Sequence, residues 1–172
     1  KALDQQVGGG EIISVRKNYL TERLLSKEVA TTIFLIRHGE TPLTPLKKFS
    51  GVGPLNPELT QEGLAQAELV AKAIAQLNPE VILSSPLKRT KQTADAISRA
   101  TGLPVNYEDA WFECSFGIWD GMSIDEVKEK YPADYHAWVS STSFAPPEGE
   151  SYDAVTVRVD EALEQIVAMY PG

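Results

Sequence analysis

Two short apolar segments, each followed by a polar turn and a segment of helical periodicity, constrain the fold more than any other feature. Residues 32–36 (TIFLI) and 81–83 (VIL) are rich in β-branched and other apolar side chains, which is typical of buried strands. Helical periodicity follows each of them, over residues 60–77 and 86–102. This alternation predicts an α/β fold with a largely parallel sheet and helices on both of its faces.

Capping residues indicate where the helices begin and end. We expect Thr60 to be the N-cap of the first helix, Ser85 to be the N-cap of the second with Pro86 at its first position, and Gly102 to end it. A third short strand is predicted around residue 105. Further helices are predicted after Ser123 and over residues 134–139 and 152–170.

Composition and charge exclude several functional classes. The chain has 172 residues and a formal net charge of −8, which argues against a non-specific nucleic-acid surface or an anionic-membrane surface. Its single cysteine, Cys114, excludes an intrachain disulfide and a cysteine-cluster metal site. No apolar run is long enough to cross a bilayer and no signal peptide is recognisable, so we expect a cytoplasmic protein.

The sequence divides into residues 1–30 and 31–172. The first part contains three consecutive glycines and shows no single period, which predicts a linker or tail. The second part carries the strand–helix alternation and is predicted to form one domain. Because the chain starts with Lys1 and stops after a Tyr-Pro-Gly connector, we expect it to be a piece of a longer polypeptide.

The first strand runs directly into Arg37, His38 and Gly39. Ligands of open α/β sheets bind beyond the carboxyl ends of the strands, which places an imidazole and a guanidinium at the expected site. Gly39 would let the backbone approach a ligand closely. Arg89 falls in the first turn of the helix after the second strand, where an anion is favoured by the helix N-terminus. Taken singly, His38 also fits a structural role and Arg89 a surface one.

Glu113 lies among aromatic residues in WFECSFGIWDG. Aromatic neighbours would restrict solvent and favour the protonated carboxyl group, which suits a general acid; the alternative is an ion pair with one of the arginines. Together these groups suit phosphoryl transfer. Neutral His38 would attack phosphorus, Arg37 and Arg89 would neutralise the phosphate oxygens, and Glu113 would protonate the leaving oxygen. The sequence shows no metal-ligand spacing, so no metal or other cofactor is expected.

Five ordered segments resemble the histidine phosphatase superfamily, also called phosphoglycerate mutase-like. They are LIRHGET, LNPELTQEGLAQA, ILSSPLKRTKQTA, WFECSFGIWDGMS and PPEGESYDAVTVRV. The resemblance implies a three-layer α/β/α sandwich in which His38 becomes phosphorylated, Arg37 and Arg89 bind phosphate and Glu113 donates a proton. It further implies substrate-binding positions, namely Thr41, Thr44, Ser50 and Gly51.

Departures from the family pattern narrow this expectation. The family usually has Asn at the position of Thr44, and the mutase branch has Arg at the position of Cys114. The resemblance therefore favours a phosphatase of the acid phosphatase or α-ribazole phosphatase type over a mutase. The family's second catalytic histidine lies on a strand after the last helix, beyond Gly172. The other histidine here, His136, is expected to be a surface or packing residue. We therefore expect the C-terminal strand to be missing from this chain, and the fragment to be inactive for lack of the second histidine.

Three functions remain open on these grounds. The first is hydrolysis of a small phosphomonoester through a phosphohistidine on His38; the others are a non-catalytic phosphate-binding module of this fold and a mutase-type phosphotransfer. The expected partner is a small phosphorylated substrate, without membrane or direct nucleic-acid contact by this domain. The family also occurs in actinobacteria behind a ribonuclease H domain, which implies an upstream fused domain.

Overall fold

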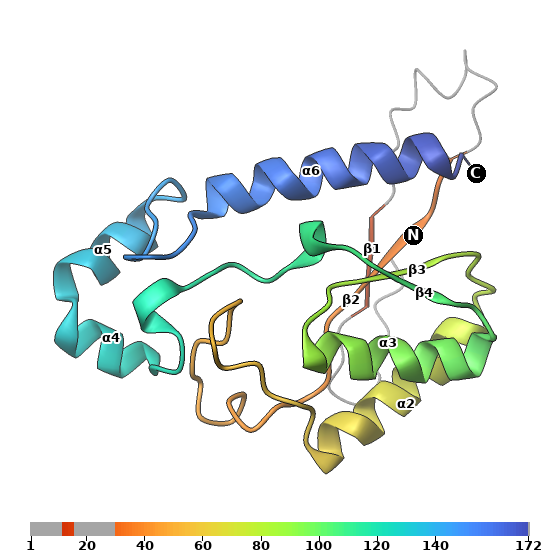
Figure 1. The fold of residues 1–172 in the computed structure, drawn as a ribbon, viewed down its shortest axis with the longest axis horizontal. Helices are drawn as coiled ribbons and strands as arrows, with labels where there is room; N and C mark the ends of the chain where they lie inside the picture. The colour runs from red at the N-terminus through yellow and green to blue at the C-terminus, as the bar shows by residue number, and fades with distance from the viewer. Residues whose placement is uncertain (1–11, 16–29, 172) are drawn as a thin grey trace.

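The computed structural model describes residues 12–15 and 30–171 (Figure 1). The strands along the described chain are β1 (Ile12–Val15), β2 (Ile33–Ile36), β3 (Ile82–Ser84) and β4 (Val105–Tyr107). The α-helices are α2 (Gln61–Ala75), α3 (Lys88–Thr101), α4 (Ile124–Lys130), α5 (Pro132–Ser140) and α6 (Tyr152–Met169). Two 3-10 helices, η1 (Asp109–Trp111) and η2 (Gly117–Trp119), lie between β4 and α4.

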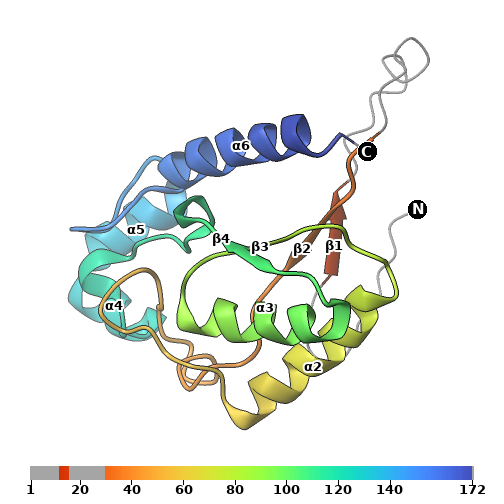
Figure 2. The ribbon, with the colours of Figure 1, turned by 45° about the vertical axis from the view of Figure 1, so that its right-hand side comes forward.

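The strands lie between helices in a layered arrangement. Figures 1 and 2 show α2 and α3 on one side of the strands and α6 on the other. β3 and β4 are parallel, with Ile82 opposite Val105, and β1 is antiparallel to β2, with Ile12 opposite Ile36. The predicted α/β class is confirmed. Residues 12–15, which fall in the predicted linker or tail, form β1.

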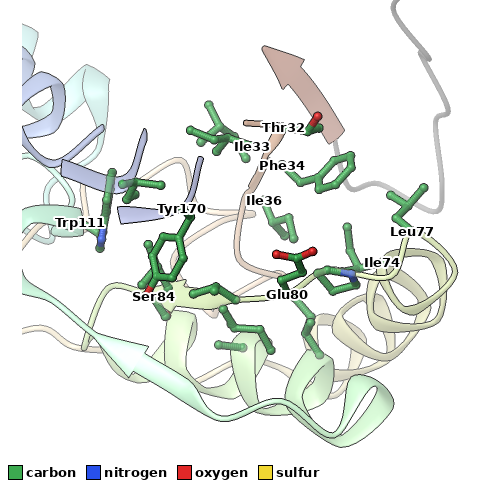
Figure 3. Close-up of a pocket in the computed structure, with 18 of the residues that line it drawn as sticks. Thr32, Ile33, Phe34, Ile36, Ile74, Leu77, Glu80, Ser84, Trp111 and Tyr170 are labelled. Carbon is green, nitrogen blue, oxygen red and sulfur yellow. The ribbon is translucent and has the colours of Figure 1, made fainter. Parts of the chain in front are cut away.

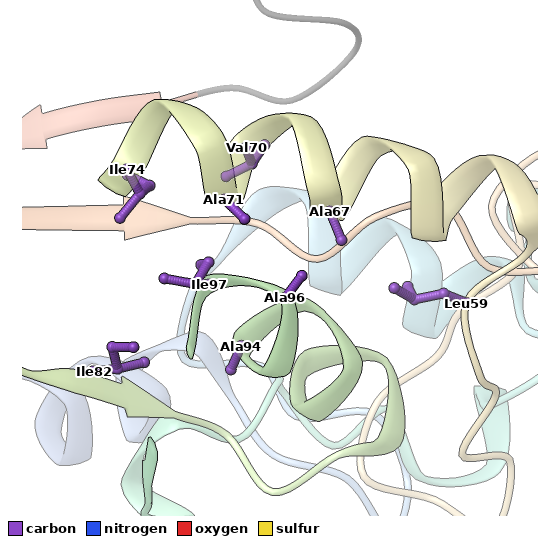
Figure 4. Close-up of a cluster of buried hydrophobic side chains, with 9 residues drawn as sticks. All are labelled: Leu59, Ala67, Val70, Ala71, Ile74, Ile82, Ala94, Ala96 and Ile97. Atoms are coloured by element: carbon purple, nitrogen blue, oxygen red, sulfur yellow. The ribbon is translucent and has the colours of Figure 1, made fainter. Parts of the chain in front are cut away.

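The main hydrophobic core joins α2 and α3 (Figure 4). Small side chains face each other across the two helices, with Ala67 and Ala71 on α2 and Ala96 on α3. Small residues at the contact let two helices pack closely, and Ile74 and Ile97 fill the space toward the strands. This helix pair therefore forms a rigid support on which the ends of β2 and β3 are placed.

A second core is aromatic and holds the long segment that follows β2. Phe49 packs against Phe116, Trp119 and Trp138 with ring centroids 4.7–5.9 Å apart. The Phe49 amide donates to the carbonyl of Met122 at 2.9 Å. The segment between β2 and α2 is thus anchored to the α4–α5 region, although it contains no regular element of its own.

The helix ends confirm two capping predictions and correct a third. Thr60 accepts a hydrogen bond from the Gly63 amide as the N-cap of α2, and Gly102 ends α3 with φ of 76°. The prediction that Ser85 is the N-cap of α3 was wrong. The helix begins at Lys88, whose amide donates to the side-chain oxygen of Asn56 at 2.9 Å. A side chain from the distant loop satisfies this amide, so a local cap is not needed.

β2 and β3 both line a cavity of about 900 Å³ (Figure 3). In the described residues these two strands belong to separate ladders and are not hydrogen-bonded to each other. Ile33 and Ile36 of β2 and Ile74 of α2 are among the apolar residues at its wall, and Tyr170 lies at the end of α6. None of the described helices is long and apolar enough to span a membrane.

Candidate active site

His38 follows β2 and is held by its own backbone neighbour. Its Nδ1 lies 2.7 Å from the carbonyl oxygen of Gly39. A carbonyl oxygen only accepts, so Nδ1 carries the proton and Nε2 of the neutral ring keeps its lone pair. Burial lowers the pKa of His38 to about 4; the Gly39 hydrogen bond acts in the opposite direction, while the charges of Arg89 and Arg37 lower it further. The imidazole is therefore neutral at pH 7 and carries a free nitrogen.

Gly39 is required by the packing of the backbone. A Cβ atom built on it would lie 2.3 Å from the carbonyl oxygen of Gly63, and one on Gly63 would lie 2.1 Å from the carbonyl oxygen of Glu40. In the structure this close approach is to α2. The Gly39 amide also donates to the Thr93 hydroxyl at 3.4 Å, and that hydroxyl donates to the Arg89 carbonyl at 2.9 Å. These contacts fix the end of β2 against the first turn of α3.

Arg89 is the second residue of α3 and is almost completely buried, with 1% of its surface exposed. Its Nη2 donates to the carbonyl oxygens of Ser50 at 2.9 Å and Gly51 at 3.4 Å. Its Nε and Nη1 are buried and have no hydrogen-bond partner. Burial lowers the pKa of Arg89, whereas the charges of Glu113 and Asp120 raise it, and a guanidinium stays charged at any ordinary pH. Such a group strongly favours an anion that can accept from both free nitrogens.

The two carbonyls that hold Arg89 are themselves fixed. The Gly51 amide donates to Asp120 Oδ1 at 2.7 Å, and a Cβ on Gly51 would lie 2.2 Å from the carbonyl oxygen of Cys114. The Ser50 hydroxyl is buried without a hydrogen-bond partner. In the structure, Ser50 and Gly51 thus orient Arg89 through their backbone.

Glu113 follows η1 and the residue Phe112. Glu113 is exposed, in contrast to the expected shielding by aromatic neighbours, and Trp111 and Phe112 are themselves only partly buried. Its Oε1 accepts from the Cys114 amide at 2.8 Å. The carboxylate makes no ion pair with Arg37 or Arg89 among the residues described here, so the alternative of an arginine partner is not observed.

The four predicted catalytic residues meet in one small cavity. It has a volume of about 220 Å³, and its walls include Arg37, His38, Arg89 and Glu113. They come from the ends of β2, α3 and the segment after η1, which are far apart in sequence. A cavity with two cations, a neutral imidazole and a carboxyl group can hold a phosphate-sized anion beside a nucleophile and a proton donor.

The predicted substrate-binding residues do not line this cavity. Thr41 is buried, and its amide and hydroxyl both contact the Thr44 hydroxyl at 3.1 Å, so these two threonines close a turn. Ser50 and Gly51 contact the site only through Arg89. Ser85 was not predicted as a site residue. Ser85 lines the cavity with a buried hydroxyl that lacks a partner, and its position directly after a buried strand was the available signal.

Across the described ranges, no three His, Cys, Asp or Glu side chains are placed to hold a metal ion. His136 is exposed on α5 and lines neither of the two cavities, in line with a surface residue.

Comparison with known proteins shows the family of this chain. The chain belongs to the histidine phosphatase superfamily (branch 1), whose family model matches residues 33–172. It is 39% identical over 135 residues to phosphoserine phosphatase 1 of Hydrogenobacter thermophilus, covering 78% of this chain and 63% of that protein. It is 36% identical over 143 residues to the bifunctional protein Rv2228c of Mycobacterium tuberculosis, covering 83% of this chain and 39% of that protein.

The solved structures confirm the expected fold family. A mycobacterial glucosyl-3-phosphoglycerate phosphatase, Rv2419c, solved in complex with VO3, superposes with a TM-score of 0.72 at 30% identity. The match covers 77% of this chain and 63% of that structure. The chain thus spans less than two thirds of the length of these relatives.

Proposed function

We propose that this domain hydrolyses a small phosphomonoester through a phosphohistidine on His38. The observation that carries the proposal is the pairing of two groups in one cavity. His38 offers a neutral ring with a free Nε2, and Arg89 offers two buried N–H groups without partners. A phosphate group would satisfy the guanidinium and bring phosphorus to the imidazole.

The residues define a two-step reaction. In the first step the Nε2 lone pair of His38 forms a bond to phosphorus as the phosphorus–oxygen ester bond breaks, and Glu113 gives its proton to the leaving oxygen. Arg37 and Arg89 stabilise the charge on the non-bridging oxygens. In the second step water attacks phosphorus, its proton passes to Glu113, the phosphorus–nitrogen bond breaks, and phosphate leaves.

The named relatives support a phosphatase over a mutase. One is named for phosphoserine and another for glucosyl-3-phosphoglycerate, and both names describe phosphatases. Cys114, which is buried beside Glu113, provides no cation for a second phosphate group. Because these two phosphatases are named for different substrates, they support phosphatase activity but no particular substrate. We therefore propose a small phosphomonoester as the substrate of this chain.

The domain is further proposed to act as one unit of a longer bifunctional protein. The support is the relative that is named as bifunctional. The match to this chain covers only 39% of the length of that relative. Sequencing the coding DNA on both sides of the segment tests this proposal. A second domain in the same reading frame is expected, and stop codons close to both ends would contradict it.

Release of inorganic phosphate from phosphoserine and related monoesters by the full-length protein tests the proposed activity. Wild-type protein is expected to turn over, His38→Ala to lose turnover, and His136→Ala to behave like wild type. Vanadate binding without any turnover would instead support the phosphate-binding module. Transfer of phosphate between hydroxyls of one metabolite would support the mutase.

A further inference from the structure

Arg158 on α6 joins the three segments that surround Glu113. Its Nε and Nη2 donate to the two carboxylate oxygens of Glu150 at 2.9 and 3.0 Å. Its Nη1 donates to the carbonyl oxygen of Ala110 at 2.7 Å, and its Nη2 also lies 3.5 Å from the carbonyl oxygen of Glu113. One guanidinium therefore contacts the backbone on the N-terminal side of Glu113, the backbone of Glu113 itself, and the loop before α6.

Glu150 contacts the backbone on the C-terminal side of Glu113. Its amide donates to the Ser115 carbonyl at 2.8 Å, and its carboxylate accepts from the Ser115 amide at 3.4 Å. The thiol of Cys114 donates to the Glu150 carbonyl at 3.3 Å. Glu113 is thus flanked on both sides by backbone that is tied to the Arg158–Glu150 pair.

This pair differs from the surface ion pairs of the chain. Each of its side chains has 23% of its surface exposed, compared with 64% and 52% for Arg99 and Glu68. A bidentate, half-buried arginine–carboxylate pair holds its geometry, whereas an exposed pair contributes little. The pKa of Glu150 is lowered and that of Arg158 is raised, mainly by their mutual hydrogen bonds, so both stay charged around neutral pH.

Glu113 itself has little else to orient it. Its carboxylate accepts from the adjacent Cys114 amide, and the structure gives it no hydrogen bond to another side chain among the described residues. The direction of its side chain into the cavity therefore follows from the backbone of residues 110–115. We propose that Arg158 and Glu150 are positioning residues that hold Glu113 where it can protonate the leaving oxygen.

This inference rests on the proposed function, and leaving-group dependence tests it. A general acid matters most when the leaving group is a poor one, such as an alkoxide, and little when it is 4-nitrophenolate. In the full-length protein, Arg158→Met is expected to lower kcat/KM for phosphoserine about 10- to 100-fold, and for 4-nitrophenyl phosphate at most about threefold. Arg158→Lys, which keeps the charge but loses the planar fork, is expected to fall between Met and wild type.

A double variant separates positioning from general structural damage. In a Glu113→Gln background, Arg158→Met is expected to cause no further loss with phosphoserine, because the acid through which it acts is already absent. Glu150→Gln is expected to reproduce the leaving-group selectivity in milder form. Arg99→Met, which breaks the exposed pair with Glu68, is the matched control and is expected to leave both substrates unchanged.

The outcomes distinguish the two proposals. Two results would overturn the positioning role. One is an equal loss of kcat/KM on both substrates in Arg158→Met. The other is a loss from Arg158→Met that adds to the loss from Glu113→Gln in the double variant. If wild-type protein and Glu113→Gln show no difference in leaving-group dependence, the proposed function of Glu113 fails instead. Vanadate affinity is expected to be unchanged in Arg158→Met, since Arg89 and its carbonyl partners are untouched. A large loss of affinity would indicate that this variant is unfolded. In that case the leaving-group dependence of Arg158→Lys and Glu150→Gln tests the positioning role.

Discussion

The Nδ1 atom of His38 lies 2.7 Å from the carbonyl oxygen of Gly39, the residue that follows it in the chain. This contact selects the ring tautomer, because the carbonyl accepts and Nδ1 must therefore donate. The remaining nitrogen, Nε2, is free to act on a ligand in the cavity. The packing of Gly39 against Gly63 fixes the position of that carbonyl.

The pH dependence of activity follows from the burial of His38. The attacking nitrogen must be unprotonated, and the pKa of His38 is lowered to about 4. For the free enzyme, protonation of His38 is expected to lower kcat/KM only near pH 4, and not near the ordinary histidine pKa of 6.5. Arg37→Gln is expected to raise this pKa, because the Arg37 charge lowers it. An NMR titration of the His38 ring centred near pH 6.5 in wild-type protein would contradict this account.

The same shift predicts an effect on stability. The unfolded chain binds a proton on His38 below its ordinary pKa of 6.5, while the folded protein binds one only near pH 4. The unfolded state is therefore favoured as pH falls between these values, by at most about 3 kcal/mol for this group. Urea unfolding at pH 7 and pH 4 measures the effect. His38→Gln is expected to lose less stability between the two pH values than wild type, and identical losses would refute the prediction.

Arg89 is expected to affect anion binding far more than stability. Arg89→Met removes the anion-binding guanidinium and should weaken vanadate binding at least about 100-fold, as loss of a buried charged partner generally does. In the absence of an anion its effect on stability should be small, because removal of two buried nitrogens without partners offsets the loss of the Nη2 hydrogen bonds to the Ser50 and Gly51 carbonyls. Calorimetric titration and thermal unfolding measure both quantities. Unchanged vanadate affinity in this variant would exclude Arg89 as a phosphate ligand.

The contact between Gly39 and Gly63 predicts a large cost for a single methyl group. Gly39→Ala would bring Cβ to 2.3 Å from the Gly63 carbonyl oxygen, so β2 and α2 would have to separate. We expect a loss of about 2 kcal/mol or more in the free energy of unfolding and a loss of activity. Gly102→Ala provides the control, since its Cβ would meet open space and only the φ of 76° costs about 1 kcal/mol. If both variants lose the same free energy of unfolding, the contact between Gly39 and Gly63 does not explain the cost of Gly39→Ala.

Local patterns in the sequence were enough to predict β2, β3, β4, most helix ends and four of the residues that line the small cavity, but not β1 or Ser85. His38 and Arg89 each follow a buried strand, and strand ends bring such residues to one edge. Asn56 could not be predicted as the partner of the Lys88 amide, because that contact depends on the path of a long irregular loop. The hydrogen bonds between Thr41 and Thr44 likewise arise from a turn whose geometry no periodicity indicates.

The least predictable part of the site is the support of Glu113. Arg158 lies on α6, 45 positions from Glu113 along the chain, and an arginine in an amphipathic helix resembles any solvated surface residue. Its contact with the Ala110 carbonyl follows only once α6 is placed beside η1. The exposure of Glu113 was also missed, because neighbours in sequence do not determine which side chains cover each other in an irregular segment.

The central claim is that His38 is the residue that becomes phosphorylated, and trapping the intermediate tests it most directly. The full-length protein would be mixed with a ³²P-labelled phosphomonoester, quenched rapidly in alkali and digested for peptide mapping. The account predicts an acid-labile, alkali-stable label on the peptide that contains His38, present in His136→Asn and absent in His38→Asn. A label on another residue, or turnover by His38→Asn at the wild-type rate, would contradict it.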